Sequence, residues 1–289
     1  MLQSISPIHD THHLRQRQNS IASLSASLDD GKTHLLLAAS GSVATIKLPL
    51  IIQALTSRHS PDTLSIRVLL TPCATRFLAG QSDEQPTISA LPALPGVDGV
   101  YGDADEWREP WRRGDGVLHI ELRRWAHALV IAPLSANTMA KIAGGFADGL
   151  LTSVVRAWDP WGELDGDADG NVPKRKKRIL VAPAMNTAMW RHPVTAKHLR
   201  VLEQEWGVNS SSFASSGRGT HDEPAGEAAA ESGERDREGW FEVLQPQQKT
   251  LVCGDVGDGA MMEWSAIVPI IEDRLGLVPA GEQQQEEGS

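Results

Sequence analysis

Small hydrogen-bonding side chains follow a short apolar run near the middle of the chain. The run Ala128–Ala132 reads ALVIA and ends at Pro133, after which Ser135, Asn137 and Thr138 stand where a helix would begin. The free N–H groups and the dipole of a helix N-terminus favour an anion, most often a phosphate. The same residue types also cap helices without binding a ligand. This stretch alone therefore predicts either a phosphate site or a helix cap.

A histidine stands at the entrance to this unit, which extends from Leu118 to Gly145. His119 precedes the apolar run by nine residues, as the printed numbering gives. Histidine exchanges protons near neutral pH, so it is a candidate acid or base for chemistry beside the phosphate site. The alternative is a core histidine beside a strand.

Two earlier segments repeat the pattern of an apolar run followed by small or hydroxyl residues. Thr33–Ala39 (THLLLAA) precedes Ser40–Ala44, and Leu64–Leu70 (LSIRVLL) precedes Thr71, Cys73 and Ala74. Small residues at such turns let backbone amides approach a phosphate closely. The G-x-G-x-x-G spacing of dinucleotide sites is missing, so the pattern favours a mononucleotide.

These units predict an α/β fold with a doubly wound parallel sheet in a single domain. Arg178–Ala182 (RILVA) is a further buried strand, which precedes Pro183–Trp190. Helices are expected after the first strand through Leu55, over Phe146–Trp158 as a continuation of the preceding helix, and over two later segments, His192–Trp206 and Ser265–Leu277. In such sheets the ligand lies outside the carboxyl ends of the strands.

Composition excludes several classes of function. The chain has 289 residues, 40% of them hydrophobic, and a net charge of −10, which disfavours general attraction to nucleic acid or anionic membranes. The basic run Lys174–Arg178 is a solvated flank in this interpretation, although a nuclear address would look similar. Two cysteines give no disulfide framework and indicate a reducing compartment. With no membrane-length apolar run and no signal-peptide core, we expect a cytoplasmic protein.

The polar segments divide the chain. We expect a flexible leader over residues 1–30, a domain over 31–278 and an acidic tail over 279–289. Insertions are expected at about 80–100, 160–174 and 209–239. Asp165, Asp167 and Asp169 alternate as in a calcium loop, but the distal Glu and second helix of a calcium hand are missing. We therefore predict no metal site.

Four motifs in one order resemble the flavin-containing cysteine decarboxylases, a family that includes the eukaryotic phosphopantothenoylcysteine decarboxylases and the fungal halotolerance proteins. They are ASGSVA at 39–44, LHIELRRWA with APLSANT within 118–138, PAMNTAMW at 183–190 and CGDVGDGAM at 253–261. The resemblance implies a Rossmann-like (flavodoxin-like) sheet, FMN as cofactor and a trimer with active sites at subunit boundaries. The implied reaction converts 4'-phosphopantothenoylcysteine to 4'-phosphopantetheine in coenzyme A biosynthesis. In it FMN oxidises the substrate thiol to a thioaldehyde, carbon dioxide leaves, and the resulting enethiol is reduced and protonated.

The resemblance also assigns residues. Three catalytic positions are implied: His119 moves the thiol proton or orients the substrate, Asn186 holds the substrate carboxylate, and Cys253 on a glycine-rich flap assists the last step. Without the motifs these would read as a core histidine, a helix cap and an inert cysteine. Substrate contacts are implied for Asn186, Met189, Arg124, Asp255, Gly257, Gly259, Ala260 and Met261. Cofactor contacts are implied for Gly41, Ser42, Val43, Thr71, Ala74, Ser135, Ala136, Asn137, Thr138, Ala184 and Met185.

Three alternatives share this fold. The chain could be a regulatory subunit that inhibits a protein phosphatase, as some fungal halotolerance proteins do, or one subunit of a heterotrimeric decarboxylase. A flavin prenyltransferase or a peptidyl-cysteine decarboxylase is the third. The full set of His119, Asn186 and Cys253 favours a self-sufficient homotrimeric enzyme, and Cys253 argues against a prenyltransferase.

Overall fold

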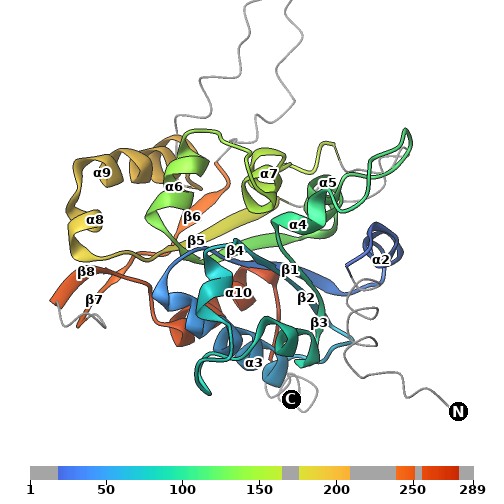
Figure 1. The fold of residues 1–289 in the computed structure, drawn as a ribbon, viewed down its shortest axis with the longest axis horizontal. Helices are drawn as coiled ribbons and strands as arrows, with labels where there is room; N and C mark the ends of the chain where they lie inside the picture. Colours follow the sequence, from blue (N-terminus) through green and yellow to red (C-terminus); the bar gives the residue numbers. More distant parts are fainter. Residues whose placement is uncertain (1–18, 165–175, 209–238, 251–255, 280–289) are drawn as a thin grey trace, which may run out of the picture.

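A six-stranded parallel sheet forms the centre of the protein in the computed structural model, which describes residues 19–164, 176–208, 239–250 and 256–279 (Figure 1). The strand order is β3-β2-β1-β4-β5-β6, the order of a Rossmann-like doubly wound sheet. The strands are β1 (Thr33–Ala39), β2 (Leu64–Leu70), β3 (Val97–Tyr101), β4 (Ala128–Leu134), β5 (Arg178–Pro183) and β6 (Phe241–Val243). A separate antiparallel hairpin joins β7 (Gln247–Thr250) to β8 (Val256–Ala260).

Helices cover both faces of the sheet. One face packs against α3 (Leu48–Arg58) and α10 (Trp264–Leu275), and the other against α5 (Leu118–Trp125), α6 (Ala136–Ala143) and α7 (Leu150–Arg156). The remaining helices are α2 (Ile21–Ala26), α4 (Asp103–Glu106), α8 (Thr187–Arg191) and α9 (Pro193–Arg200), with short turns η1 (Val43–Lys47), η2 (Ala74–Phe77), η3 (Ile88–Ala93) and η4 (Val201–Glu205). No helix among the described residues is long and apolar enough to cross a membrane.

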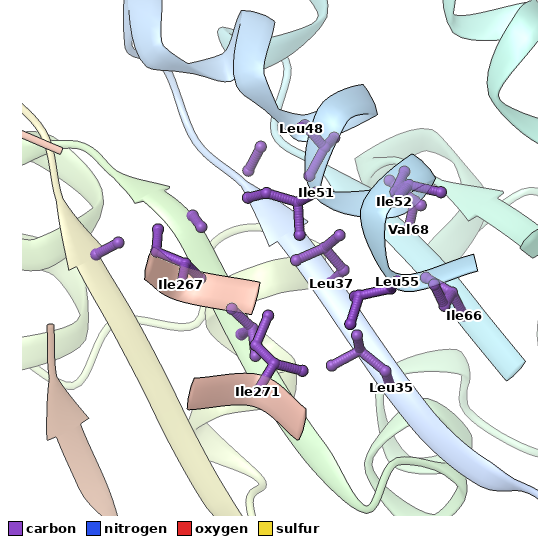
Figure 2. Close-up of a cluster of buried hydrophobic side chains, with 14 of the residues drawn as sticks. Leu35, Leu37, Leu48, Ile51, Ile52, Leu55, Ile66, Val68, Ile267 and Ile271 are labelled. Carbon is purple, nitrogen blue, oxygen red and sulfur yellow. The ribbon is translucent and has the colours of Figure 1, made fainter. Parts of the chain in front are cut away.

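The strands are buried because they are apolar on both sides. In β1, Leu35 and Leu37 face α3 and α10, as Figure 2 shows, while Leu36 and Ala38 face the opposite layer. All seven residues of β2 and of β4 are buried. Each fully buried leucine or isoleucine contributes about 1.5–3 kcal/mol, so these two layers fix the positions of the strand ends.

The fold begins earlier than the sequence predicts, which corrects the expected leader over residues 1–30. Leu24 of α2 is fully buried, and the Asn19 amide pairs with both backbone groups of Val100 on the edge strand β3. The buried Arg67 guanidinium, in β2, donates to Ser23 Oγ at 3.2 Å and to the Tyr101 hydroxyl. The sequence did not predict these contacts because the serine-rich composition of this segment is typical of an exposed leader. Residues 1–18 lie outside the described residues.

Three further expectations are wrong in detail. The predicted insertion at 80–100 contains η3 and the start of β3, an integral strand whose apolar pattern is interrupted by Asp98 and Gly99. The helix expected to run on into Phe146–Trp158 instead ends at Ala143, Gly145 takes a left-handed φ of 72°, and α7 starts at Leu150. Pro133 does not end β4, because its carbonyl still accepts from Ser40 N at 3.0 Å and the strand continues to Leu134.

The predicted insertions at 160–174 and 209–239 and the tail at 279–289 lie largely outside the described residues, as do all three aspartates of the possible calcium loop. The helix predicted over His192–Trp206 is confirmed as α9 with η4, and the last helix as α10.

Candidate active site

The predicted cofactor residues lie at one edge of the sheet, where β1, β2, β4 and β5 end. The strand order reverses between β1 and β4, which is the point where doubly wound sheets bind ligands. Ser40 joins these two strands: its Oγ donates to Pro133 O at 3.0 Å and accepts from Ser135 N at 2.7 Å. These hydrogen bonds fix the end of β1 next to the end of β4, and the two strand ends form the base of the candidate site, called the floor below.

Ser135 forms the β4–α6 corner of this floor. Its Oγ accepts from Thr138 N at 3.3 Å, so the side chain caps α6 and both residues are buried. The capping interpretation of Ser135 is confirmed. The cap satisfies the N–H group of Thr138 in the first turn of α6. The N–H groups of Ala136 and Asn137 have no acceptor within the helix. They are available to an anion.

The loops that follow β1 and β2 approach each other closely and form a second corner of the site. A Cβ on Gly41 would lie 2.5 Å from Cys73 Cβ, so only glycine fits between the two loops. Ser42 caps η1 by accepting from Ala44 N at 3.4 Å, and Thr71 Oγ1 accepts from Ala74 N at 3.3 Å. Val43, a predicted cofactor contact, is exposed at this corner. After Thr71 the chain forms only the short turn η2.

The hairpin docks on the end of β5. Met185 N donates to Gly259 O at 2.9 Å, and Ala184 N donates to Leu134 O at 2.9 Å. A Cβ on Gly259 would lie 2.5 Å from Met185 O and 3.0 Å from Trp190 Cβ, so this position requires glycine. Met261 is buried against the core, and Ala260 is half-buried.

Asn186 is exposed at the start of α8. Its Oδ1 accepts from Met189 N at 2.9 Å, so the cap interpretation is confirmed. The backbone N–H requires the amide oxygen on that side, which turns Nδ2, the donor end, away from the helix. The Met189 side chain is 51% exposed and therefore is not core packing. Capping and carboxylate binding are compatible for Asn186.

His119 is the second residue of α5, not a residue beside a strand. Its Nδ1 lies 2.8 Å from Oε1 of Glu106, the last residue of α4. The His119 side chain is 22% exposed and that of Glu106 is 6% exposed. The sequence analysis missed Glu106 because an acidic residue in a charged loop looks solvated.

A second residue pair that sequence reasoning missed joins the hairpin to α8. Arg191 donates to Asp258 Oδ2 through Nη2 at 2.9 Å and through Nε at 3.2 Å. Figure 1 shows β8 beside α8 at one end of the molecule. The ion pair holds the β8 end of the predicted flap next to Asn186. Gly257 is buried in the same strand.

One described residue of the predicted site, Arg124, is not brought to this edge. Arg124 lies in the last turn of α5 and pairs with Glu121 at 3.3 Å, while its carbonyl accepts from Lys177 Nζ, just before the start of β5. Cys253 and Asp255 lie outside the described residues, so their roles stay predictions.

The described residues contain no cluster of three or more His, Cys, Asp or Glu side chains with metal-binding geometry. A cavity of about 490 Å³ lies on the α6–α7 side, lined by Phe146 and four tryptophans, Trp158, Trp161, Trp206 and Trp240, among others. None of the predicted site residues lines it. The candidate site is therefore the open rim at the strand ends.

A family model described as Flavoprotein matches residues 23–276 of this chain. The chain belongs to the flavoprotein family. This match, together with the relatives described next, confirms the family expected from the motifs.

Curated relatives include proteins named as phosphopantothenoylcysteine decarboxylases and one with a different name. A phosphopantothenoylcysteine decarboxylase of Arabidopsis thaliana is 38% identical over 236 residues, 82% of each chain. The probable thymidylate synthase of Schizosaccharomyces pombe is 39% identical over 94% of this chain and 34% of its own length. The phosphopantothenoylcysteine decarboxylase subunit SIS2 of Saccharomyces cerevisiae is 32% identical over 87% of this chain and 42% of its own. This chain thus spans about a third to two fifths of these fungal relatives.

Solved structures confirm the Rossmann-like fold. A cysteine-to-serine mutant of PPC decarboxylase complexed with pantothenoylaminoethenethiol has a TM-score of 0.56 and 36% identity, covering 83% of this chain and 97% of that one. The FMN binding protein AtHal3 has the same TM-score of 0.56 and identity of 36%, over 83% and 95%.

Proposed function

We propose that this protein catalyses the FMN-dependent decarboxylation of 4'-phosphopantothenoylcysteine to 4'-phosphopantetheine, a step of coenzyme A biosynthesis. The observation that carries the proposal is the Asn186 amide, which caps α8 with its oxygen and keeps its donor end outward beside the exposed Met189. Relatives and solved structures named as this decarboxylase, at 36–38% identity, support it.

The residues at the strand ends fit FMN. Ser42, Thr71 and Ser135 orient three successive turns, and the N–H groups of Ala136 and Asn137 suit the phosphate. Ala184 and Met185, which are apolar and largely buried at the end of β5, are proposed to contact the edge of the ring system. When bound, FMN supplies the two-electron oxidation and reduction of the substrate's sulfur-bearing carbon.

The protein's own groups then have separate roles. His119 Nε2 is the nitrogen not facing Glu106, and it takes the proton of the substrate thiol or orients that thiol. Asn186 Nδ2 donates to the substrate carboxylate, and because the amide is neutral, the carboxylate can still leave as carbon dioxide. Met189 and the hairpin residues Gly257–Met261 exclude water over the substrate. Cys253 is proposed to assist the final protonation.

The proposal includes a cytoplasmic homotrimer with active sites between subunits. An open rim and an exposed Met189 in one chain support a site completed by another copy. A specific observation favours one alternative: a relative is named a decarboxylase subunit, so the chain could work beside a paralogous subunit.

The purified protein is tested with phosphopantothenoylcysteine, following carbon dioxide, 4'-phosphopantetheine and flavin absorbance together. Flavin with stoichiometric product formation supports the proposal. Flavin without turnover contradicts self-sufficiency, and turnover on adding a paralogous subunit would then identify a heteromer. A preparation that binds no flavin would overturn the proposed function.

A further inference from the structure

The partner of His119 is a buried carboxylate with one oxygen in use. Glu106 Oε1 lies 2.8 Å from His119 Nδ1, and Glu106 Oε2 is buried with no hydrogen-bond partner among the described residues. A buried charge that serves only the fold is normally satisfied at both oxygens, because an unpaired one costs about 1–3 kcal/mol. The arrangement is therefore poorly explained by stability alone.

The turn that carries Glu106 is held in place from two sides. Asp103 Oδ1 accepts from Leu150 N at 3.0 Å, which ties α4 to the start of α7. Asp105 Oδ2 accepts from Gly102 N at 2.8 Å and closes the turn on itself. These contacts leave Glu106 little freedom to move away from the His119 ring.

A carboxylate only accepts hydrogen bonds, so this contact requires the hydrogen on His119 Nδ1. The lone pair of the neutral ring then lies on Nε2, which is the tautomer that a base acting through Nε2 needs. When Nε2 takes a proton, the ring becomes a cation and the adjacent carboxylate stabilises it.

We infer that Glu106 is a positioning residue that fixes the tautomer of His119 and stabilises its protonated form. The inference rests on the proposed function in one respect, namely that His119 moves a proton of the substrate.

The test compares Glu106→Ala, Glu106→Gln and Glu106→Asp with the matched control Glu109→Gln, which removes the same charge from an exposed position three residues away. Each variant is isolated with FMN, and its flavin content and melting temperature are measured. Steady-state kinetics give kcat and KM. Nitrogen-15 NMR of histidine-labelled protein, assigned with His119→Asn, reports which ring nitrogen of His119 carries the hydrogen.

We expect wild-type His119 to carry its hydrogen on Nδ1. Glu106→Ala should shift the ring toward the Nε2–H form and lower kcat about 100-fold with KM changed less than about twofold. Glu106→Gln can still accept from Nδ1 through its amide oxygen, so it should keep the tautomer and lose about tenfold in kcat. Glu106→Asp should be no slower than the Ala variant, and Glu109→Gln should match wild type.

Three results would overturn the inference: a wild-type ring with its hydrogen on Nε2, unchanged kcat in Glu106→Ala, or a slowed Glu106→Ala whose His119 tautomer is unaltered. The NMR measurement needs no substrate. A wild-type protein that binds no flavin, or that turns over neither alone nor with a paralogous subunit, would therefore defeat the proposed function, while the ring measurement still decides the Glu106–His119 pairing.

Discussion

The amide of Asn186 uses only one of its two ends to hold the fold. Its oxygen caps α8, and its nitrogen is the end that the proposed reaction needs. Structural and functional roles usually compete in sequence interpretation, yet here they occupy different atoms of the same side chain. Substitutions can therefore separate them.

Asn186→Asp should keep the cap and abolish the function. Aspartate caps helices as well as asparagine does, so the melting temperature should change by no more than about 2 °C. Its carboxylate would repel the substrate carboxylate, and kcat/KM should fall at least about 100-fold. Asn186→Ala should lose the cap as well, about 1 kcal/mol of stability. An Asp variant that unfolds early but turns over normally would show that only the cap matters.

Gly259→Ala should release the hairpin from β5. The added methyl group would lie 2.5 Å from Met185 O, so the Met185–Gly259 hydrogen bond must break or the strand must shift. We expect a loss of about 1–3 kcal/mol in the free energy of unfolding and at least about tenfold in kcat, with FMN content retained. Urea unfolding and kinetics measure both. Gly102→Ala, whose methyl group would meet Leu70 O at an ordinary 3.6 Å, is the matched control.

Residue types predicted a site at the strand ends because hydroxyl and small residues follow β1, β2 and β4. Glu106 was not predicted because its partner, His119, is 13 positions away and because acidic and polar residues lie near it in the sequence. Nothing in the local pattern distinguishes a buried carboxylate from a solvated one. Such a residue is found only when the fold brings α4 beside α5.

At the scale of elements, continuous apolar runs predicted the buried strands well. The predicted runs over Thr33–Ala39 and Leu64–Leu70 coincide with β1 and β2, since parallel strands with both faces covered need no polar alternation. The edge strand β3 reads VDGVY, and Asp98 accepts from the Ser65 hydroxyl of β2. β6 has only three residues and depends on tertiary contacts, so the sequence could not identify it.

One carboxylate ties β6 to its neighbours. Glu242 pairs with Arg178 of β5 at 3.2 Å and with Arg274 of α10 through two contacts of 2.8 and 2.9 Å. Burial raises the pKa of Glu242, but hydrogen bonds and charge attraction from the two arginines outweigh it and hold the pKa below its usual 4.5. A lowered pKa contributes stability above pH 4.5, which is lost as the pH falls through the folded-state value.

Glu242→Gln should therefore destabilise the protein at neutral pH and progressively less in acid. We expect a loss of about 1–2 kcal/mol in the free energy of unfolding at pH 7, shrinking as the pH falls below 4.5. Denaturant unfolding from pH 7 to pH 3 measures the difference. A penalty that stays constant over this range would mean that the amide lost packing contacts and not charge pairing.

At the scale of the whole molecule, α5 presents its two predicted site residues in different directions. His119 and Arg124 are five positions apart, which at about 100° per residue turns their side chains about 140° away from each other. His119 faces Glu106 on α4, whereas Arg124 reaches back to Glu121. One chain is therefore badly arranged to place both side chains on a single substrate, and a second copy could supply Arg124.

Mixing two inactive variants tests this arrangement. His119→Asn and Arg124→Ala should each lose at least about 100-fold in kcat/KM as pure proteins. If each site of a cyclic trimer takes its histidine from one subunit and its arginine from the next, random 1:1 co-assembly leaves both residues intact at about a quarter of the sites. Co-expressed or refolded mixtures should thus recover about a quarter of wild-type activity, while unmixed samples stay inactive. If both residues serve a site within the same subunit, no mixture can contain an intact pair, and the absence of recovery in verified mixed trimers would refute the shared site.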